Sequence, residues 1–194
     1  MDLYAEAIAR FRTLFDAARA TDLPEPAAMS LATASTDGRP AVRTVLLKHV
    51  DERGFVFYTN AGSRKGEQIQ DNPRAALCFY WQPLAQQVLV EGAVAAVSAA
   101  ESDAYWVTRL RQSQLGAWAS RQSQLLTGRT ELEERVAFYE KRFADGPVPR
   151  PDYWHGFRVA PDLLEFWVSR PGRLHVRDRY YREQDVWKHT LIYP

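Results

Sequence analysis

The chain has 194 residues, of which 46% are hydrophobic, and its formal net charge is +1. The length suits one domain, the apolar content excludes a globally disordered chain, and the near-neutral charge argues against non-specific nucleic-acid binding, which needs a basic excess. The single cysteine, Cys78, excludes an internal disulfide framework and fits a reducing, cytoplasmic location. No apolar run approaches the roughly 20 residues that span a bilayer, so we expect no membrane anchor and no secretory signal.

The first expected element is an amphipathic helix. Apolar residues recur at helical spacing near the start of the chain and predict a helix over 3–20. Pro24 follows and ends it. We therefore expect one domain, 1–194, made of an N-terminal helical segment, 1–22, and a barrel with helices, 23–194.

Short segments rich in Val, Leu, Phe and Tyr come next, separated by turn residues such as Asp37-Gly38 and Pro171-Gly172. Strands with such short turns favour an antiparallel sheet or barrel over alternating β-α-β units. The predicted fold class is α+β, mainly antiparallel β, with a barrel core and three or four peripheral helices. The predicted strands are 29–35, 41–50, 54–59, 75–81, 87–97, 154–159, 163–168, 173–181 and 187–192.

Three further helices are predicted from their start signals. Ser63 can cap a short helix. Ser98, followed three residues later by Glu, forms a capping box and predicts a helix over 98–111. Thr130 begins the same pattern and predicts a helix over 130–143.

Cationic side chains form two separated sets. Arg and Lys bond phosphate oxygens strongly, and a helix start adds unpaired N–H donors, so each set can bind a phosphate. Two sets indicate two anionic ligands, or one ligand with two charged ends. The chain has no Gly-x-Gly-x-x-Gly motif and no Walker loop, which argues against a Rossmann dinucleotide site or an ATP-driven reaction. The first set is Arg43, Lys48, Arg64 and Lys65, and the second is Arg109, Arg173 and Arg177.

The helix predicted over 98–111 carries a phenol and a guanidinium, and a hydroxyl follows just beyond its end. Tyr105 and Arg109 are four residues apart, so they would share one helix face, and Ser113 follows in nearly the same direction. Together they can bind a phosphate monoester. A solvated Arg with a Tyr packed beside it gives the same spacing, and on spacing alone this alternative stays open.

Arg173, His175 and Arg177 alternate in a predicted strand and would point to one face, with Leu174 and Val176 on the other. This pattern is typical of a strand that lines a site, and equally of a solvated sheet edge. A His on such a face can orient or polarise a substrate near neutral pH. The remaining histidines show no metal-ligand spacing, so we expect no metal.

Taken in order, several motifs make the chain resemble the pyridoxine/pyridoxamine 5′-phosphate oxidase family from about residue 23 to residue 187. Each is weak alone, and their specificity comes from their shared order. They are Arg43-Thr-Val-Leu-Leu-Lys48, Phe57-Tyr-Thr-Asn60, Gly62-Ser-Arg-Lys65, Gln87-Val, Ser113-Gln-Leu-Gly-Ala-Trp118, Ser120-Arg-Gln-Ser123, Tyr153-Trp-His-Gly-Phe-Arg158, Glu165-Phe-Trp167 and Arg173-Leu-His175.

The resemblance implies a split β-barrel of the FMN-binding, Greek-key type, as a homodimer with FMN in the cleft between subunits. The implied substrate contacts are Lys48, Tyr105, Arg109 and Ser113 for the phosphate, and the catalytic pair Arg173 and His175 against the pyridine ring. The implied FMN contacts are Arg43, Thr44, Val45, Leu46, Leu47, Lys48, Tyr58, Thr59, Arg64, Lys65, Gln87, Gln122, Ser123, Trp167 and Arg177.

The implied reaction oxidises pyridoxamine 5′-phosphate or pyridoxine 5′-phosphate to pyridoxal 5′-phosphate, with O2 as acceptor and H2O2 as product. Two alternatives are a flavin oxidase of the same fold in a secondary, phenazine-like pathway, and a non-catalytic protein that binds flavin or pyridoxal phosphate. A structural dimer without cofactor is a third. The chain departs from the family pattern at Val176, where an Asp is usual, at Leu191, where an Arg is usual, and in a short N-terminal segment without Arg-x-x-Tyr.

Overall fold

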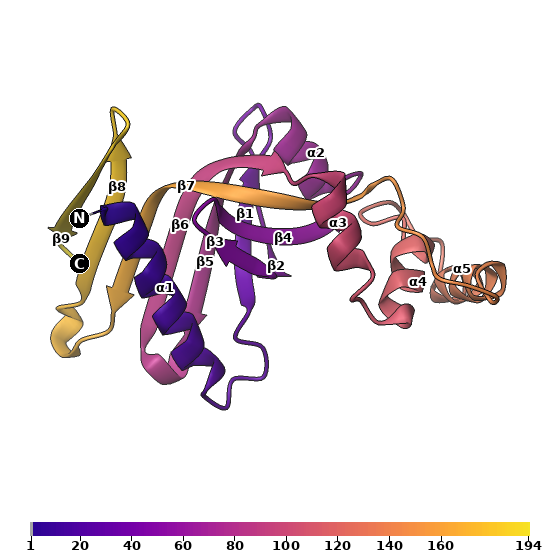
Figure 1. Cartoon of the computed structure of the whole chain (residues 1–194), viewed down its shortest axis with the longest axis horizontal. Coiled ribbons are helices and arrows are strands. Elements are labelled where there is room, and N and C mark those ends of the chain that lie inside the picture. The colour runs from indigo at the N-terminus through magenta and orange to yellow at the C-terminus, as the bar shows by residue number, and fades with distance from the viewer. Residues whose placement is uncertain (1) are drawn as a thin grey trace.

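The computed structural model describes residues 2–194, and within them one nine-stranded antiparallel sheet curls into a half-open barrel (Figure 1). The strand order is β2-β1-β5-β6-β7-β4-β3, with β8 paired to β7 and β9 paired to β8. The predicted α+β class and split-barrel fold are confirmed. The strands are β1 (Ala28–Ala34), β2 (Pro40–Leu46), β3 (His49–Asp51), β4 (Gly54–Asn60), β5 (Arg74–Trp81), β6 (Gln86–Ala96), β7 (Trp154–Val168), β8 (Val176–Glu183) and β9 (Val186–Ile192).

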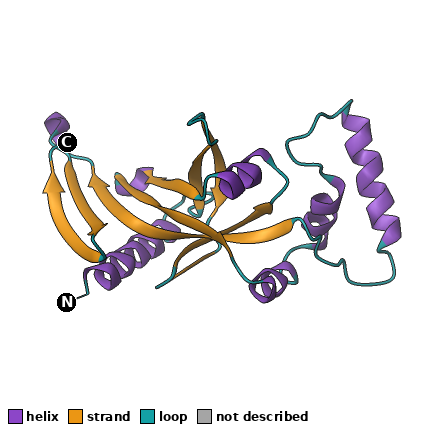
Figure 2. Ribbon diagram, turned by 90° about the horizontal axis from the view of Figure 1, so that it is seen from above, coloured by secondary structure: helices purple, strands orange, loops and turns teal. Residues whose placement is uncertain are grey.

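Five α-helices surround this sheet within residues 2–194, one or two more than predicted. Two short 3-10 turns, Gln82–Leu84 and Pro171–Arg173, complete the elements. Figure 2 shows α4 and α5 extending away from the barrel at the end opposite to the C-terminal strands. The helices are α1 (Leu3–Arg19), α2 (Arg64–Asp71), α3 (Ala99–Trp106), α4 (Arg111–Ala119) and α5 (Arg129–Arg142).

The main core forms between α1 and the barrel. Asp2 caps α1 by accepting hydrogen bonds from the first backbone N–H groups of the helix. The fully buried Phe11 ring of this helix lies 4.7 Å from Phe55 and 5.0 Å from Phe79, both edge-on. Such aromatic pairs stabilise a core beyond the area that they bury. The helix is thereby fixed across the sheet, next to β8 and β9.

Two predicted strands have different bounds in the structure. The segment 41–50 divides into β2 and β3, because Leu47 N–H donates to Ala27 and Lys48 N–H donates to Val56, so the backbone changes partner strand between them. The segments 154–159 and 163–168 are one continuous strand, β7, which stays paired with β6 through a bulge opposite Gly92. A Cβ on Gly92 would lie 2.0 Å from the carbonyl oxygen of Ala160, which explains a glycine there.

The helix predicted over 98–111 is shorter in the structure. Its capping box at Ser98 is present, but α3 ends at Trp106. The Trp106 carbonyl accepts a hydrogen bond from the Gln114 side chain at 2.9 Å, and Thr108 Oγ1 bonds the Tyr105 carbonyl at 2.8 Å. These bonds satisfy carbonyls that a longer helix would use, and a separate helix, α4, follows.

Two other local predictions are wrong in detail. Ser63 precedes α2, but its hydroxyl bonds the Asn60 carbonyl instead of a helix N–H. The helix predicted from Thr130 begins at Arg129, and Thr127 makes the reciprocal bonds with Glu131. Cys78 of β5 is half-buried, and burial raises the pKa of its thiol.

Candidate functional site

An open cavity of about 610 Å³ lies beside the barrel. It is bounded by β2, the end of β4, the start of α2, the end of α3 with the turn after it, and the segment after α4. Its lining residues are Ala41, Val42, Arg43, Thr44, Val45, Leu46, Lys48, Tyr58, Thr59, Arg64, Lys65, Tyr105, Arg109, Gln122 and Ser123.

The lining of this cavity is cationic. Five of its side chains carry a positive charge and none is a carboxylate. Positive charges gathered in a partly enclosed site repel each other and lose part of their hydration. An anionic ligand offsets both energetic costs. The predicted first cationic set is thus brought together in space, and Arg109 of the second set joins it.

Arg43 is fixed toward the barrel wall by neutral partners. Its guanidinium donates to the Leu31 carbonyl at 3.0 Å and to Thr33 Oγ1 at 2.8 Å. Burial and the nearby charge of Arg64 lower the pKa of Arg43. The group has no carboxylate partner within residues 2–194, so its charge remains available to a ligand in the cavity.

Lys65 is the most buried cation of the site, with 8% of its surface exposed. Its ammonium donates to Gln122 Oε1 at 2.7 Å, Ser63 Oγ at 2.8 Å and Thr59 Oγ1 at 2.9 Å. All three acceptors are neutral. Burial, with a further contribution from Arg43, lowers the pKa of Lys65 to about 8.

Arg109 lies among aromatic rings. Its guanidinium carbon is 4.8 Å from the centre of the Trp154 ring and 5.6 Å from that of Trp106, within the range of cation–π attraction. One terminal nitrogen donates to the Ser113 carbonyl at 3.1 Å, whereas the buried Nε has no hydrogen-bond partner in residues 2–194. Burial lowers the pKa of this group. Buried donors in proteins are normally hydrogen-bonded, so this unpaired Nε beside the cavity suits an acceptor atom of a ligand.

Tyr105 lies on α3 and forms part of an aromatic stack. Its ring is 4.1 Å from Tyr58, and Tyr58 is 5.2 Å from Trp154, all nearly parallel. The predicted reason for its proximity to Arg109, a shared helix face, is wrong, since Arg109 lies in the turn after α3. Ser113 lines a neighbouring cavity of about 330 Å³ that also includes Arg109. The predicted trio therefore does lie together.

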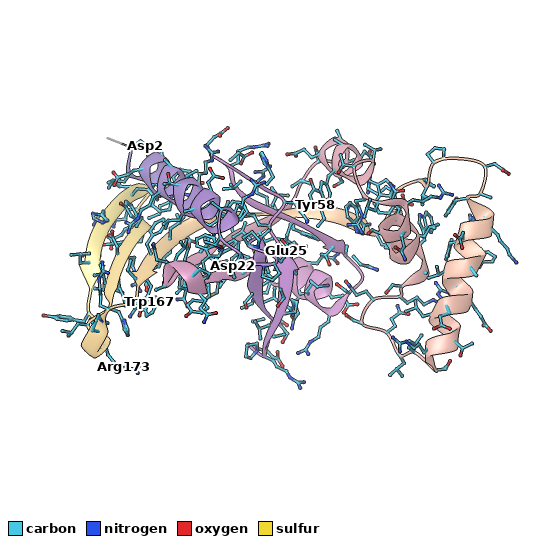
Figure 3. All side chains as sticks on the ribbon, turned by 90° about the horizontal axis from the view of Figure 1, so that it is seen from below. Asp2, Asp22, Glu25, Tyr58, Trp167 and Arg173 are labelled. Carbon is cyan, nitrogen blue, oxygen red and sulfur yellow. The ribbon has the colours of Figure 1, made fainter. Side chains whose placement is uncertain are left out.

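The other predicted site residues form a separate cluster near the C-terminal strands. Gln87, Trp167 and Arg177 are adjacent across β6, β7 and β8, and the His175 ring lies 4.6 Å from Trp167. Figure 3 shows Trp167 and Arg173 together at one end of the molecule, away from Tyr58. None of these residues lines the first cavity, and Leu47, also predicted to contact the cofactor, is buried in the core.

The predicted alternation of 173, 175 and 177 in one strand is wrong. Strand β8 begins at Val176, and Arg173 ends a 3-10 turn with φ of 62° after Gly172. Leu174, predicted on the opposite face of that strand, is 74% exposed. Arg177 is held by Glu165, which is 2% exposed and also binds Arg179. His175 Nδ1 accepts a hydrogen bond from the Arg170 backbone.

Sequence reasoning assigned no role to Trp106, Trp154, Thr33 or Gln68, which hold Arg109 and Arg43 in place. Trp154 lies in a quoted motif, but no local spacing connects it to Arg109. Residues 2–194 contain no cluster of His, Cys, Asp or Glu side chains that could hold a metal ion. The same part of the chain has no helix long and apolar enough to cross a membrane.

Comparison with known proteins agrees with this geometry. Residues 14–140 match the family model for pyridoxamine 5′-phosphate oxidase, and residues 154–194 match the model for the C-terminal dimerisation region of pyridoxine 5′-phosphate oxidase. The chain belongs to the pyridoxine/pyridoxamine 5′-phosphate oxidase family. It is an oxidoreductase by that membership, and its dimerisation region supports a homodimer.

Relatives named pyridoxine/pyridoxamine 5′-phosphate oxidase cover the chain closely. The one from Alkalilimnicola ehrlichii is 55% identical over 196 residues and covers 100% of both chains. The one from Myxococcus xanthus is 55% identical over 187 residues and covers 96% of this chain and 91% of its own. Among solved structures, PhzG from Burkholderia lata, in complex with tetrahydrophenazine-1-carboxylic acid, is 33% identical with a TM-score of 0.88, covering 96% of this chain and 90% of PhzG.

Proposed function

We propose that this protein is an FMN-dependent oxidase that converts pyridoxamine 5′-phosphate or pyridoxine 5′-phosphate to pyridoxal 5′-phosphate. The observation that carries the proposal is the cationic cavity, which is lined by the buried Lys65 and the half-buried Arg109, neither paired with a carboxylate in residues 2–194. Its two groups of donors suit two phosphates, one of the cofactor and one of the substrate.

The residues of the first cavity fit an FMN phosphate. Lys65 and Arg64 lie at the start of α2, where helix N–H groups add to their charge, and Arg43 approaches from β2. Bound FMN would supply the redox chemistry, taking a hydride from C4′ of the substrate and passing two electrons to O2. For the amine, water is consumed and ammonia released; for the alcohol, the aldehyde and H2O2 are the only products.

The substrate phosphate would be bound by Lys48, Tyr105 and Arg109 of this cavity, together with Ser113 of the neighbouring cavity. The unpaired Nε of Arg109 provides a donor there, and the Tyr58–Tyr105 stack forms a flat apolar wall. Holding the substrate ring in a fixed orientation can supply several kcal/mol of the barrier reduction. A hydride transfer needs no strong protein base, and this lining contains none.

The remaining site residues would come from the second subunit. In one chain, the path along β7 from Trp154 to Trp167 measures roughly 40 Å at about 3.3 Å per residue. A twofold dimer brings such separated surfaces together. We infer that FMN binds at the subunit interface, with the partner subunit's Trp167 and the partner subunit's Arg177 on the flavin and the partner subunit's Arg173 on the pyridine ring. The partner subunit's His175 would lie against the same ring.

A second candidate is a phenazine-type flavin oxidase, favoured by the likeness to PhzG. The substrate of such an enzyme would carry no phosphate, so Arg109 and Tyr105 would have no phosphate group to bind. A non-catalytic flavin-binding protein is the third candidate. A cytoplasmic location remains a prediction from the single cysteine.

The test is an absorption spectrum of the protein reconstituted with FMN, before and after anaerobic addition of pyridoxamine 5′-phosphate. The oxidase hypothesis predicts bleaching of the visible flavin absorption, about one pyridoxal 5′-phosphate per flavin, and H2O2 on admission of air. Bleaching by a reduced phenazine precursor alone would favour the second candidate. A yellow protein that no substrate bleaches would favour the third, and failure to bind FMN would overturn all of them.

A further inference from the structure

A ring of four charged side chains joins α3 to the barrel. Arg158 of β7, whose side chain is 12% exposed, donates to Glu101 Oε1 at 3.0 Å and also to Asp51. Arg53, in the turn between β3 and β4, donates to Asp51 at 2.9 Å and to Glu101 at 3.0 Å. Each guanidinium thus bridges both carboxylates, and charge-assisted bonds of this kind are stronger than neutral ones.

Glu101 has two separate tasks in this arrangement. Its Oε2 closes the capping box of α3 by accepting bonds from the backbone and hydroxyl of Ser98. Its Oε1 receives both arginines. A Gln at this position can keep the capping box, but its neutral amide loses the two ion pairs. The two tasks can therefore be separated experimentally.

The ring lies one helical turn from the proposed substrate site. Tyr105 follows Glu101 by four residues on α3, so it lies on the same side of the helix. Its ring stacks on Tyr58 of β4, whose hydroxyl bonds the Glu101 carbonyl at 3.4 Å. The position of α3 on the barrel decides whether this stack forms, and Arg109 follows in the turn that α3 leads into.

We propose that Glu101 and Arg158 are a positioning pair that sets Tyr105 and Arg109 for the phosphate of the substrate. Neither residue lines the cavity, so the pair acts through the placement of α3. This inference rests on the proposed function for the identity of the ligand. The cations proposed to hold the FMN phosphate, Arg43, Arg64 and Lys65, lie on β2 and at the start of α2, and Arg43 and Lys65 bond neither Glu101 nor Arg158.

The test is a double-mutant cycle of Glu101→Gln, Arg158→Met and both together. In the FMN-loaded enzyme, each single variant should raise the KM for pyridoxamine 5′-phosphate about fivefold, with kcat and the FMN Kd changed less than about twofold. The KM of the double variant should rise by less than the product of the two single effects, because both single variants remove the Arg158–Glu101 interaction. The Kd of pyridoxal 5′-phosphate, measured by fluorescence quenching, should rise in parallel.

Asp162→Asn is the matched control. Asp162 also lies on β7 and pairs with Arg74 at 2.7 Å, away from α3, so it should leave KM and Kd unchanged. Effects that add in the double variant, a fall in kcat alone, or the same KM rise in Asp162→Asn would overturn the proposal.

A readout without substrate separates this inference from the proposed function. Glu101→Gln should change the near-ultraviolet circular dichroism of the Tyr58–Tyr105 stack, while its far-ultraviolet spectrum stays the same. If wild-type protein binds no B6 phosphate, the proposed function fails, and the dichroism still tests the placement of α3. An unchanged near-ultraviolet spectrum in Glu101→Gln would overturn the positioning role.

Discussion

The ammonium nitrogen of Lys65 lies 2.7 Å from Oε1 of Gln122, and this contact joins the start of α2 to the segment after α4. Both residues line the cationic cavity. Because all hydrogen-bond acceptors of Lys65 are neutral, the ligand-free protein holds a buried ammonium charge with no carboxylate partner. This relationship leads to the first two predictions.

Replacing Lys65 with Met should weaken FMN binding by about 2 kcal/mol, or roughly thirtyfold in Kd, because one charge-assisted hydrogen bond to the phosphate is lost. The ligand-free variant should be at least as stable as the wild type, since the buried charge is gone. Fluorescence titration of FMN and thermal melting measure the two effects. Lys188→Met, which removes an exposed ion pair with Glu183, is the control and should leave the FMN Kd unchanged.

The pH dependence follows from the pKa of Lys65, which burial lowers from 10.5 to about 8. Between these values the unfolded chain binds more protons than the folded protein, so the stability of the ligand-free protein should rise with pH across that window. FMN favours the charged lysine, so its affinity should fall above about pH 8. Urea titrations and FMN titrations at several pH values would measure both slopes, and a wild type that parallels Lys65→Met at every pH would contradict the prediction.

Arg109→Lys should separate phosphorylated from unphosphorylated substrates. Lysine keeps the charge but loses the planar contact with Trp154 and the unpaired Nε. We expect the KM for pyridoxamine 5′-phosphate to rise at least tenfold, while kcat/KM for unphosphorylated pyridoxamine stays the same. Arg111→Lys is the control, because Arg111 bonds the Gly146 carbonyl and does not line the cavity. Equal effects on both substrates would argue against a phosphate contact.

Subunit complementation tests the shared site. Lys65→Met and Arg173→Glu should each give a weakly active homodimer. If each site takes Lys65 from one subunit and Arg173 from the other, a mixed dimer has one intact site and one doubly altered site. Unfolding and refolding the two variants together in equal amounts should recover about a quarter of wild-type activity. Recovery of no activity, with mixed dimers proven by mass spectrometry, would place both residues of a site in one chain.

Gly66→Ala should destabilise the protein by about 1–3 kcal/mol, as overpacked positions do. A Cβ at this position would lie 2.2 Å from the Ala61 carbonyl oxygen, so the start of α2 must move. Lys65 precedes this residue, and FMN affinity should fall with stability. Gly116→Ala in α4 is the control: its added methyl group meets no atom within 4 Å, and alanine favours the helix. Chemical denaturation of both variants should therefore give effects of opposite sign.

Local signals in the sequence predicted the elements well. The capping box of Ser98 and Glu101 and the turn at Gly38 depend on residues a few positions apart, and both are found as expected. The end of α3 could not be predicted, because the bond that competes for the Trp106 carbonyl comes from Gln114 in another helix. The alternation of charged and apolar side chains predicts a strand at Arg173, but such a pattern carries no information on backbone dihedral angles. The φ of Arg173, 62°, lies outside the strand region.

For the candidate site, spacing alone revealed only that cations cluster. The contact of Lys65 with Gln122 spans 57 residues, and that of Arg158 with Glu101 spans the same number. No helical or strand period connects residues so far apart. The resemblance to a family predicts most of the lining residues. The roles of Trp106, Trp154 and the charged ring around Glu101 can be recognised only from the three-dimensional structure.

Strand β7 carries Trp154 at its first residue, beneath Arg109, and Trp167 near its last, beside His175. An insertion of one residue between them would turn every later side chain to the opposite face. An insertion of two would keep the faces but displace Trp167 by about 7 Å. The residue count of this strand therefore fixes the distance between the two clusters, and evolutionary changes of length should accumulate in the connections at 124–128 and 143–153 and spare 154–168.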